Sequence, residues 1–332
     1  MSYLLKPLEQ CKLTFNNRLV MPPMATSKSE QDGRVSKDIL DYYNEKSQGG
    51  YISLIIIEHS FVTTQGKASE RQLSIAEDSV VENLKELAKI IHKNGSKAVM
   101  QINHAGSAAS KNVTGYEPVG PSAIANLRTG NVPMELSKSE IQIIIGEFVN
   151  AALRTKEAGF DGVEIHSAHG YLLNQFFSPL TNKRTDGYGG DLLGRIQIHL
   201  EIIKAVRIAV GNDFPILLRL GASDYMEGGS TIEDSKIAAM KFENAGVDVL
   251  DISGGFCGYT VPGNTSQGYF SPLTEAIKEV VSIPVILTGG ITQALAAEKL
   301  LSEGKADLIG VGRAVYKDSK WARNTIESLK TS

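Results

Sequence analysis

The chain has 332 residues, a length that suits either one large domain or two smaller ones. Its 34 basic and 37 acidic side chains give a formal net charge of −3, so charge favours neither nucleic acid nor a membrane surface as a partner. Only Cys11 and Cys257 carry thiols, which gives no disulfide framework and suits a reducing compartment. We find no signal-peptide pattern and no membrane-length apolar run, and we expect a soluble cytoplasmic protein.

Short apolar runs alternate with helical patterns along the first half of the chain. Three runs predict buried strands, because they are apolar and the first ends at two prolines that cannot donate to a sheet: 19–21, 53–57 and 97–102. Apolar side chains recur at helical spacing over 78–95. Ser137 and Glu140 have the spacing of a capping box, which opens a long helix that reaches Ala158.

The second half repeats one layout, in which a helix ends at glycine, a turn carries aspartate, and a buried strand follows. Three segments share it: 158–165, 245–252 and 304–311. We predict two further strands at 215–220 and 284–288, and helices near 193–210, 231–245, 272–281 and 292–302. Eight strands that alternate with helices predict an α/β fold, a (β/α)8 TIM barrel in a single domain over 1–332. An open doubly wound sheet is the structural alternative, although no Gly-x-Gly-x-x-Gly follows the first strand.

Three long loops interrupt this alternation, and each follows a strand: 103–136, 166–192 and 253–271. Loops of this length are uncommon in compact domains unless they bind something or are disordered. Because the loops after the strands all lie at the C-terminal face of a barrel, we expect them to form the walls and lid of one site.

Two histidines and a tyrosine, His166, His169 and Tyr171, stand within six residues at the end of a predicted strand. Their N–H and O–H groups donate hydrogen bonds and exchange protons, so we interpret them as catalytic residues; the alternative is that they cap a loop. The two histidines alone could ligate zinc, but no third ligand of suitable spacing accompanies them, and we expect no metal.

Glycines follow the last two predicted strands, in Thr288-Gly-Gly290 and in Gly312-Arg313. Glycine lets the backbone approach a ligand, and arginine contacts phosphate oxygens in pairs, so these turns predict the phosphate site that barrels carry there. The alternative is that the glycines only make tight turns.

Gln101 and Arg219 are predicted at the ends of strands three and five. Glutamine offers a donor and an acceptor together, which suits the edge of an amide-like heterocycle, and arginine would stabilise developing negative charge. Either residue could instead anchor a loop. Glu58, at the end of the second strand, is interpreted as structural, holding a neighbouring backbone or an arginine.

The stretch from His166-Ser-Ala-His-Gly-Tyr171 to Asn182-Lys-Arg-Thr-Asp-Gly-Tyr-Gly-Gly190 resembles the signature of the Old Yellow Enzyme family of NAD(P)H-dependent flavin oxidoreductases. Four further segments resemble the family in the same order along the chain: 17–24, 101–106, 218–225 and 311–313. The resemblance covers essentially the whole chain. It implies an FMN across the C-terminal mouth of the barrel and NADH or NADPH as the hydride donor.

The resemblance also implies a role for each candidate residue. Pro22, Pro23, Met24 and Ala25 would line the flavin, with His59 also in the flavin site; Gln101 and Arg219 would meet its pyrimidine edge, and Gly289, Gly290, Gly312 and Arg313 would hold its phosphate. His166 and His169 would bind the carbonyl oxygen of the substrate, so that a conjugated C=C accepts hydride from flavin N5. Tyr171 would protonate the neighbouring carbon. One shared site predicts ping-pong kinetics.

The substrates implied are α,β-unsaturated carbonyl compounds or similar small electrophiles, with no nucleic acid or membrane partner and a possible homo-oligomer. Alternatives are a flavin oxidoreductase whose main acceptor is oxygen, a quinone or a nitro compound, a barrel lyase, isomerase or hydrolase for a phosphorylated sugar, and a non-catalytic binding barrel. Ala25 stands where the family often has Thr or Cys, so we expect a lower flavin potential than in an Ala25→Cys variant. Because the sequence ends at Ser332, we do not expect the iron–sulfur extension of larger relatives.

Overall fold

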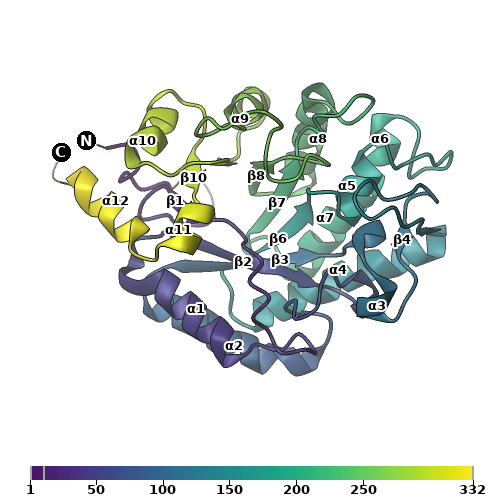
Figure 1. The fold of residues 1–332 in the computed structure, drawn as a ribbon, viewed down its shortest axis with the longest axis horizontal. Helices are drawn as coiled ribbons and strands as arrows, with labels where there is room; N and C mark the ends of the chain where they lie inside the picture. Colours follow the sequence, from purple (N-terminus) through teal and green to yellow (C-terminus); the bar gives the residue numbers. More distant parts are fainter. Residues whose placement is uncertain (1, 10–11, 331–332) are drawn as a thin grey trace.

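The computed structural model describes residues 2–9 and 12–330. Eight parallel strands form a closed barrel in the order β1-β10-β9-β8-β7-β6-β3-β2 (Figure 1). The strands are β1 (Leu19–Met21), β2 (Leu54–Phe61), β3 (Lys97–Asn103), β6 (Gly162–Ser167), β7 (Ile216–Gly221), β8 (Val249–Ser253), β9 (Val285–Thr288) and β10 (Leu308–Gly310). The predicted closed barrel is therefore confirmed, and the open sheet is excluded.

Helices cover the outside of the barrel and alternate with its strands. The longer ones are α1 (Lys37–Ser47), α2 (Val81–Lys93), α4 (Lys138–Glu157), α7 (Gln197–Val210), α8 (Ile232–Ala245), α9 (Ser271–Lys278), α10 (Ala294–Ser302) and α12 (Trp321–Lys330). The capping box predicted from Ser137 and Glu140 begins α4, and Thr231 with Asp234 forms another at α8. None of the helices in the described ranges is both long and apolar enough to cross a membrane.

The barrel interior at the N-terminal ends of the strands is apolar, and the N-terminal segment of the chain closes it. Leu8 and Phe15 pair as an antiparallel bridge across the open end of the strands. One separate cluster of buried side chains, here called the floor, consists of Leu8, Leu13, Phe15, Val20, Leu54, Ile56, Val99, Leu217, Val249, Ile286 and Leu308. Because successive side chains of a strand face opposite ways, the residues two positions further along each strand also face the interior, one layer nearer the C-terminal mouth.

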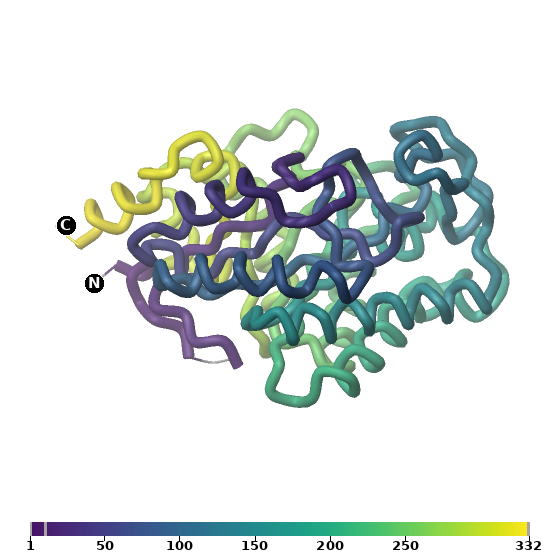
Figure 2. Tube along the Cα trace, turned by 90° about the horizontal axis from the view of Figure 1, so that it is seen from below, coloured from purple at the N-terminus to yellow at the C-terminus, as the bar shows by residue number. Residues whose placement is uncertain are grey.

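The long loops lie at the C-terminal ends of the strands. The loop after β3 contains η4 (Gly106–Ala108), α3 (Lys111–Thr114) and a small parallel pair, β4 (Val119–Gly120) with β5 (Met134–Glu135). Figures 1 and 2 both place this excursion at the end of the molecule opposite the two chain termini. The loop after β6 contains α5 (Leu172–Phe177) and α6 (Leu192–Arg195), and α11 (Arg313–Lys317) follows β10.

Several elements differ from the sequence prediction. The helices α1, α3, α5, α11 and α12 and the short strands β4 and β5 were not predicted, and β2 extends to Phe61 instead of ending at residue 57. The pairing register of β2 with β3 shifts between Ile57 and Ser60, which marks an irregularity where the alternation of buried side chains breaks. This irregularity places Glu58 and His59 inside the strand rather than after it.

Candidate active site

Four aromatic side chains, here called the imidazole–phenol cluster, meet above the C-terminal ends of β2 and β6. The ring centroids of His166 and His169 lie 5.1 Å apart, and those of His166 and Tyr171 lie 5.2 Å apart. His59 joins from the neighbouring side, 5.4 Å from Tyr171. The structure therefore brings together the three predicted catalytic residues and His59.

The backbone around this cluster is held in a strained conformation by surrounding contacts. His169 has φ of 60°, a left-handed value that is uncommon for residues other than glycine. Its Nε2 lies 2.7 Å from Ser253 Oγ, at the end of β8, and its carbonyl accepts a hydrogen bond of 2.6 Å from Arg128 Nη2. Asn174 Oδ1 accepts a hydrogen bond from the N–H of Gly170 at 2.7 Å. These contacts fix the turn that aims the imidazole into the mouth.

The imidazoles are neutral at physiological pH. Burial lowers the pKa of His166 and of His169 well below 6.5, with a further contribution from the charge of Arg219. Burial, assisted by Arg219, lowers the pKa of His59 to about 4. Burial raises the pKa of Tyr171, partly offset by the charge of Arg128. The cluster thus offers neutral N–H donors beside a phenol that keeps its proton.

A ring of polar side chains, here called the polar layer, lies directly above the floor. It consists of Gln101, Glu164, Arg219, Asp251 and Thr288. Four of these stand two residues beyond a floor residue of their own strand, and Glu164 pairs with Gln101 in the sheet. Gln101 Nε2 donates to Glu164 Oε1 at 2.7 Å, and Arg219 Nε lies 3.3 Å from Asp251 Oδ2. Gln101 and Arg219 were predicted at strand ends. They lie inside β3 and β7 instead and face the barrel interior.

The glycine turns after β9 and β10 form a narrow cradle on the other side of the mouth. A Cβ at Gly290 would lie 2.6 Å from the Tyr269 ring, and one at Gly312 would lie 2.8 Å from Met24 Sδ. Arg313 Nη2 donates to the hydroxyl of Tyr269 at 3.1 Å. The predicted phosphate residues are therefore neighbours of one another and of the Pro22–Ala25 turn, on the same rim of the barrel as the imidazoles.

The turn after β1 is attached to β2 through Glu58. The Glu58 carboxylate accepts hydrogen bonds from Thr26 Oγ1 at 2.6 Å and from the Thr26 N–H at 3.4 Å. The Glu58 N–H in turn donates to the hydroxyl of Tyr43 at 2.8 Å. Burial raises the pKa of Glu58 to about 7, against the hydrogen bonds from Thr26. The structural role predicted for Glu58 is confirmed, since it holds the backbone beside Ala25.

The residues at the mouth fit a flat ring with a polar edge and a phosphate tail. Several of their buried polar atoms have no hydrogen-bond partner among the described residues: both amide atoms of Asn103, His166 Nδ1 and Arg219 Nε. Unpaired buried polar groups are rare in proteins unless a ligand or water completes them. Gln101 and Arg219 could meet a heterocycle edge, and the cradle with Arg313 could hold a phosphate.

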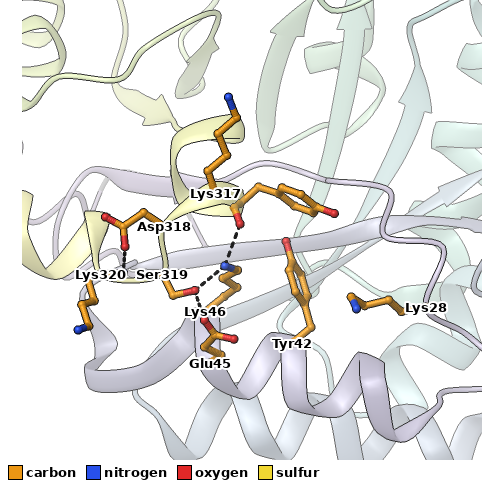
Figure 3. Close-up of a pocket in the computed structure, with 9 residues that line it drawn as sticks. Lys28, Tyr42, Glu45, Lys46, Lys317, Asp318, Ser319 and Lys320 are labelled. Carbon is orange, nitrogen blue, oxygen red and sulfur yellow. Dashed lines mark hydrogen bonds between the residues drawn. The ribbon is translucent and has the colours of Figure 1, made fainter.

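A surface groove of about 550 Å³ lies beside this cradle, between α1 and the segment that joins α11 to α12 (Figure 3). Its centre is occupied by Lys46, a buried side chain of α1 that donates to the Tyr316 carbonyl and to Ser319 Oγ. Burial lowers the pKa of this amine. The Lys46 ammonium already donates to the Tyr316 carbonyl and to Ser319 Oγ. We therefore interpret the groove as the junction that fixes α11, and with it Arg313, against α1.

Sequence reasoning missed five residues of the site: Asn103, Arg128, Glu164, Ser253 and Asp251. Four of them have a signal that could have been used. The polar residues of otherwise apolar strands stand at alternate positions, and two-residue periodicity places Asn103 with Gln101, Glu164 with His166, and Asp251 with Ser253. Arg128 carries no such signal, because it lies in a loop far from His169 in sequence.

The fold is a (β/α)8 barrel, and its C-terminal mouth gathers residues that fit a flat ring with a phosphate tail. Residues 3–331 match the NADH:flavin oxidoreductase / NADH oxidase family, and the chain belongs to this family of FMN-dependent, NAD(P)H-using oxidoreductases. The resemblance inferred from the sequence is thereby confirmed.

Known relatives agree with this assignment. The chain is 44% identical to an NADH oxidase from Thermoanaerobacter brockii over 95% of its own residues, but it spans only 49% of that protein. It is 38% identical to an NADPH dehydrogenase from Clostridium acetobutylicum, over 92% of this chain and 89% of the relative. An Old Yellow Enzyme homologue from Zymomonas mobilis superposes with a TM-score of 0.85 at 27% identity, over 98% of this chain and 92% of that structure.

Proposed function

We propose that this protein is an FMN-dependent oxidoreductase that uses NADH or NADPH to reduce the activated C=C of α,β-unsaturated carbonyl compounds. In this proposal the whole chain forms one FMN-binding domain. The observation that carries it is the pair of neutral imidazoles, His166 and His169, whose rings lie 5.1 Å apart beside the buried phenol of Tyr171. Two donors and one proton source at a redox cofactor match what a conjugated carbonyl needs.

Each group of the cluster has a separate task. His166 and His169 donate hydrogen bonds to the carbonyl oxygen and so stabilise the negative charge that develops there. Their lowered pKa values keep them as neutral donors instead of general acids. Tyr171 holds its proton at neutral pH and delivers it to carbon. Bound FMN supplies the two-electron carrier that connects the nicotinamide to the acceptor.

The remaining site residues hold the cofactor in this proposal. The turn Pro22–Ala25 and His59 line the ring, and Gln101 with Arg219 bind its pyrimidine edge. The phosphate binds to Gly289, Gly290, Gly312 and Arg313. The support for this placement is the close approach of Gly312 to Met24, which joins the glycine turn to the Pro22–Ala25 turn, and the inward-facing Arg219, whose Nε is ion-paired with Asp251 but makes no hydrogen bond among the described residues.

A second candidate is an oxidase that passes electrons mainly to oxygen. The name of the Thermoanaerobacter relative, an NADH oxidase, favours it. Reduction of oxygen needs neither a pair of hydrogen-bond donors to a carbonyl oxygen nor an acid that protonates carbon. Loss of the Tyr171 hydroxyl should therefore affect enone reduction but not oxygen reduction.

Stopped-flow reoxidation separates the two candidates. The FMN-loaded enzyme is reduced anaerobically with NADH or NADPH and mixed with cyclohexenone, a quinone, a nitro compound or oxygen. We expect Tyr171→Phe to slow reoxidation by cyclohexenone by about 10²-fold or more, the usual contribution of a general acid, and to leave reoxidation by oxygen unchanged. The exposed Tyr116 supplies the matched control, Tyr116→Phe, which should behave like the wild type.

The double variant His166→Ala/His169→Ala tests the donor pair. We expect a loss of about 10²–10³-fold with cyclohexenone, as for a lost oxyanion donor, and a smaller effect on flavin reduction. If the wild type reacts with oxygen far faster than with any enone, or if enone reoxidation survives in the double variant, the ene-reductase proposal is wrong.

A further inference from the structure

Two carboxyl groups and a single cation are enclosed in the polar layer. The side chains of Glu164 and Asp251 have no exposed surface, and Arg219 is 4% exposed. The strand register places Arg219 beside Asp251 in the sheet, and Gln101 beside Glu164. The floor below contributes only apolar side chains. Full ionisation would therefore leave an uncompensated negative charge inside the barrel.

The contacts of the two acids differ. Asp251 has the charged partner, since Arg219 Nε lies 3.3 Å from its Oδ2, and Thr288 Oγ1 donates to its Oδ1 at 3.4 Å. Glu164 receives a hydrogen bond from the neutral amide of Gln101, and its Oε2 has no partner among the described residues. Asp251 Oδ2 also lacks a hydrogen bond among the described residues, but it lies in an ion pair with Arg219, whereas no ion pair within the described residues includes Glu164.

We propose that Glu164 and Asp251 are positioning residues that carry one negative charge between them, located on Asp251, and that this charge sets how strongly Arg219 attracts electrons into the flavin. The inference rests on the flavin placement proposed above, with Arg219 at the pyrimidine edge. It does not depend on whether the acceptor is an enone or oxygen.

The electrostatics of the layer agree with this assignment. Burial and then the charge of Asp251 raise the pKa of Glu164 well above 4.5, and two close carboxylates cannot both ionise in a medium of low polarity. Burial also raises the pKa of Asp251, but Arg219 and Thr288 act in the opposite direction. The other titratable groups that act on the layer, His59, His166 and His169, are neutral.

The two acids then have different effects on the cofactor. Asp251 neutralises part of the Arg219 charge, which weakens the stabilisation of the negative charge that reduction leaves on the ring. Protonated Glu164 adds no charge. Its carbonyl oxygen accepts from Gln101 Nε2, which fixes the amide and leaves the Gln101 oxygen to accept from a ring N–H. Asp251 thus sets the reduction potential of the flavin, and Glu164 sets the orientation of the Gln101 amide at the pyrimidine edge.

Redox titration of the FMN-loaded enzyme tests the assignment. Asp251→Asn frees the charge of Arg219, so we expect the equilibrium constant for flavin reduction to rise at least tenfold, which is about 30 mV for a two-electron couple. Glu164→Gln removes no charge and keeps the shape, so we expect less than a threefold change. Equal shifts in the two variants, no shift in Asp251→Asn, or a large shift in Glu164→Gln would overturn the proposal.

A measurement without flavin keeps the test independent of cofactor placement and of how well Asp251→Asn folds. Infrared spectra of the apo-protein at pH 7, recorded in a Glu58→Gln background because Glu58 is itself partly protonated at this pH, should contain a protonated-carboxyl band that disappears when Glu164→Gln is added. If the Glu58→Gln background lacks this band, Glu164 is ionised and the inference is wrong. If the band is present but the potential of Asp251→Asn is unchanged, the charge assignment holds and the placement of the flavin over Arg219 fails.

Discussion

The floor and the mouth of the barrel are built on the same strands, yet their interiors carry opposite chemistry. The floor is wholly apolar and is closed by Phe15 and Leu8. One layer nearer the mouth, two of the same strands present Arg219 and Asp251, and β6 adds Glu164. The difference teaches that a change in the floor should affect stability and leave the chemistry of the mouth nearly intact.

The largest expected effect belongs to the floor. Phe15 has no exposed surface, and Phe15→Ala should lower the free energy of unfolding by about 3–5 kcal/mol, through lost burial and a cavity. Urea unfolding followed by circular dichroism measures it, with the 61% exposed Val132 as the control in Val132→Ala. The flavin spectrum and acceptor kinetics of the folded variant should match the wild type. A floor variant with normal stability but altered kinetics would break the comparison.

The second effect concerns the pH dependence of stability at the mouth. The pKa of Glu58 is about 7 in the folded chain, against 4.5 for an ordinary glutamate, so its stabilisation is complete below pH 4.5 and is lost as pH rises through 7. This is worth about 3 kcal/mol at about 1.36 kcal/mol per pKa unit. Glu58→Gln cannot titrate. As pH rises through 7, the free energy of unfolding of the wild type should therefore fall by that amount relative to the variant. A difference that stays constant with pH would contradict this account.

The smallest effect is a charge effect at the rim. Arg128 lowers the pKa of Tyr171, so Arg128→Met should make the phenol a weaker acid. Exposed charges are worth about 0.2–1 kcal/mol, which predicts an enone step slower by a factor of about 1.4 to 5. Added salt should slow the wild type toward the variant, because it screens the arginine. Lys111→Met, in the same loop and exposed, is the control and should change neither rate nor salt dependence.

Local patterns predict the strands well because the barrel buries them on both faces. The runs around Val99, Ile165 and Leu218 are apolar enough to be recognised without neighbours. Helix α1 escaped prediction because its sequence is mostly polar, and only Ile39, Tyr42 and Tyr43 of its apolar side chains are buried, with Leu40 partly so. The helix forms because Ser36 caps its N-terminus and because one of its sides packs against the barrel. The cap is local in sequence, whereas the packing depends on the folded barrel.

The site was predictable to the extent that its residues gather in one segment. His166, His169 and Tyr171 are neighbours in sequence, and the glycine turns have a recognisable composition. The pairing of Glu164 with Gln101, and of Asp251 with Arg219, depends on register between strands that are 32 to 63 residues apart. A single sequence does not state that register, so the charges of the polar layer emerged only from the folded chain.

The loop after β8 touches both ends of the site. It begins at Ser253, which holds the His169 imidazole at 2.7 Å, and it carries Tyr269, which holds Arg313 at 3.1 Å. Exchanging this loop to widen the acceptor range would also remove the Tyr269 contact that holds Arg313, the residue proposed to bind the FMN phosphate. Cofactor retention should therefore be assayed in every such chimera, and selection for new substrates will draw on the same segment that keeps the enzyme loaded.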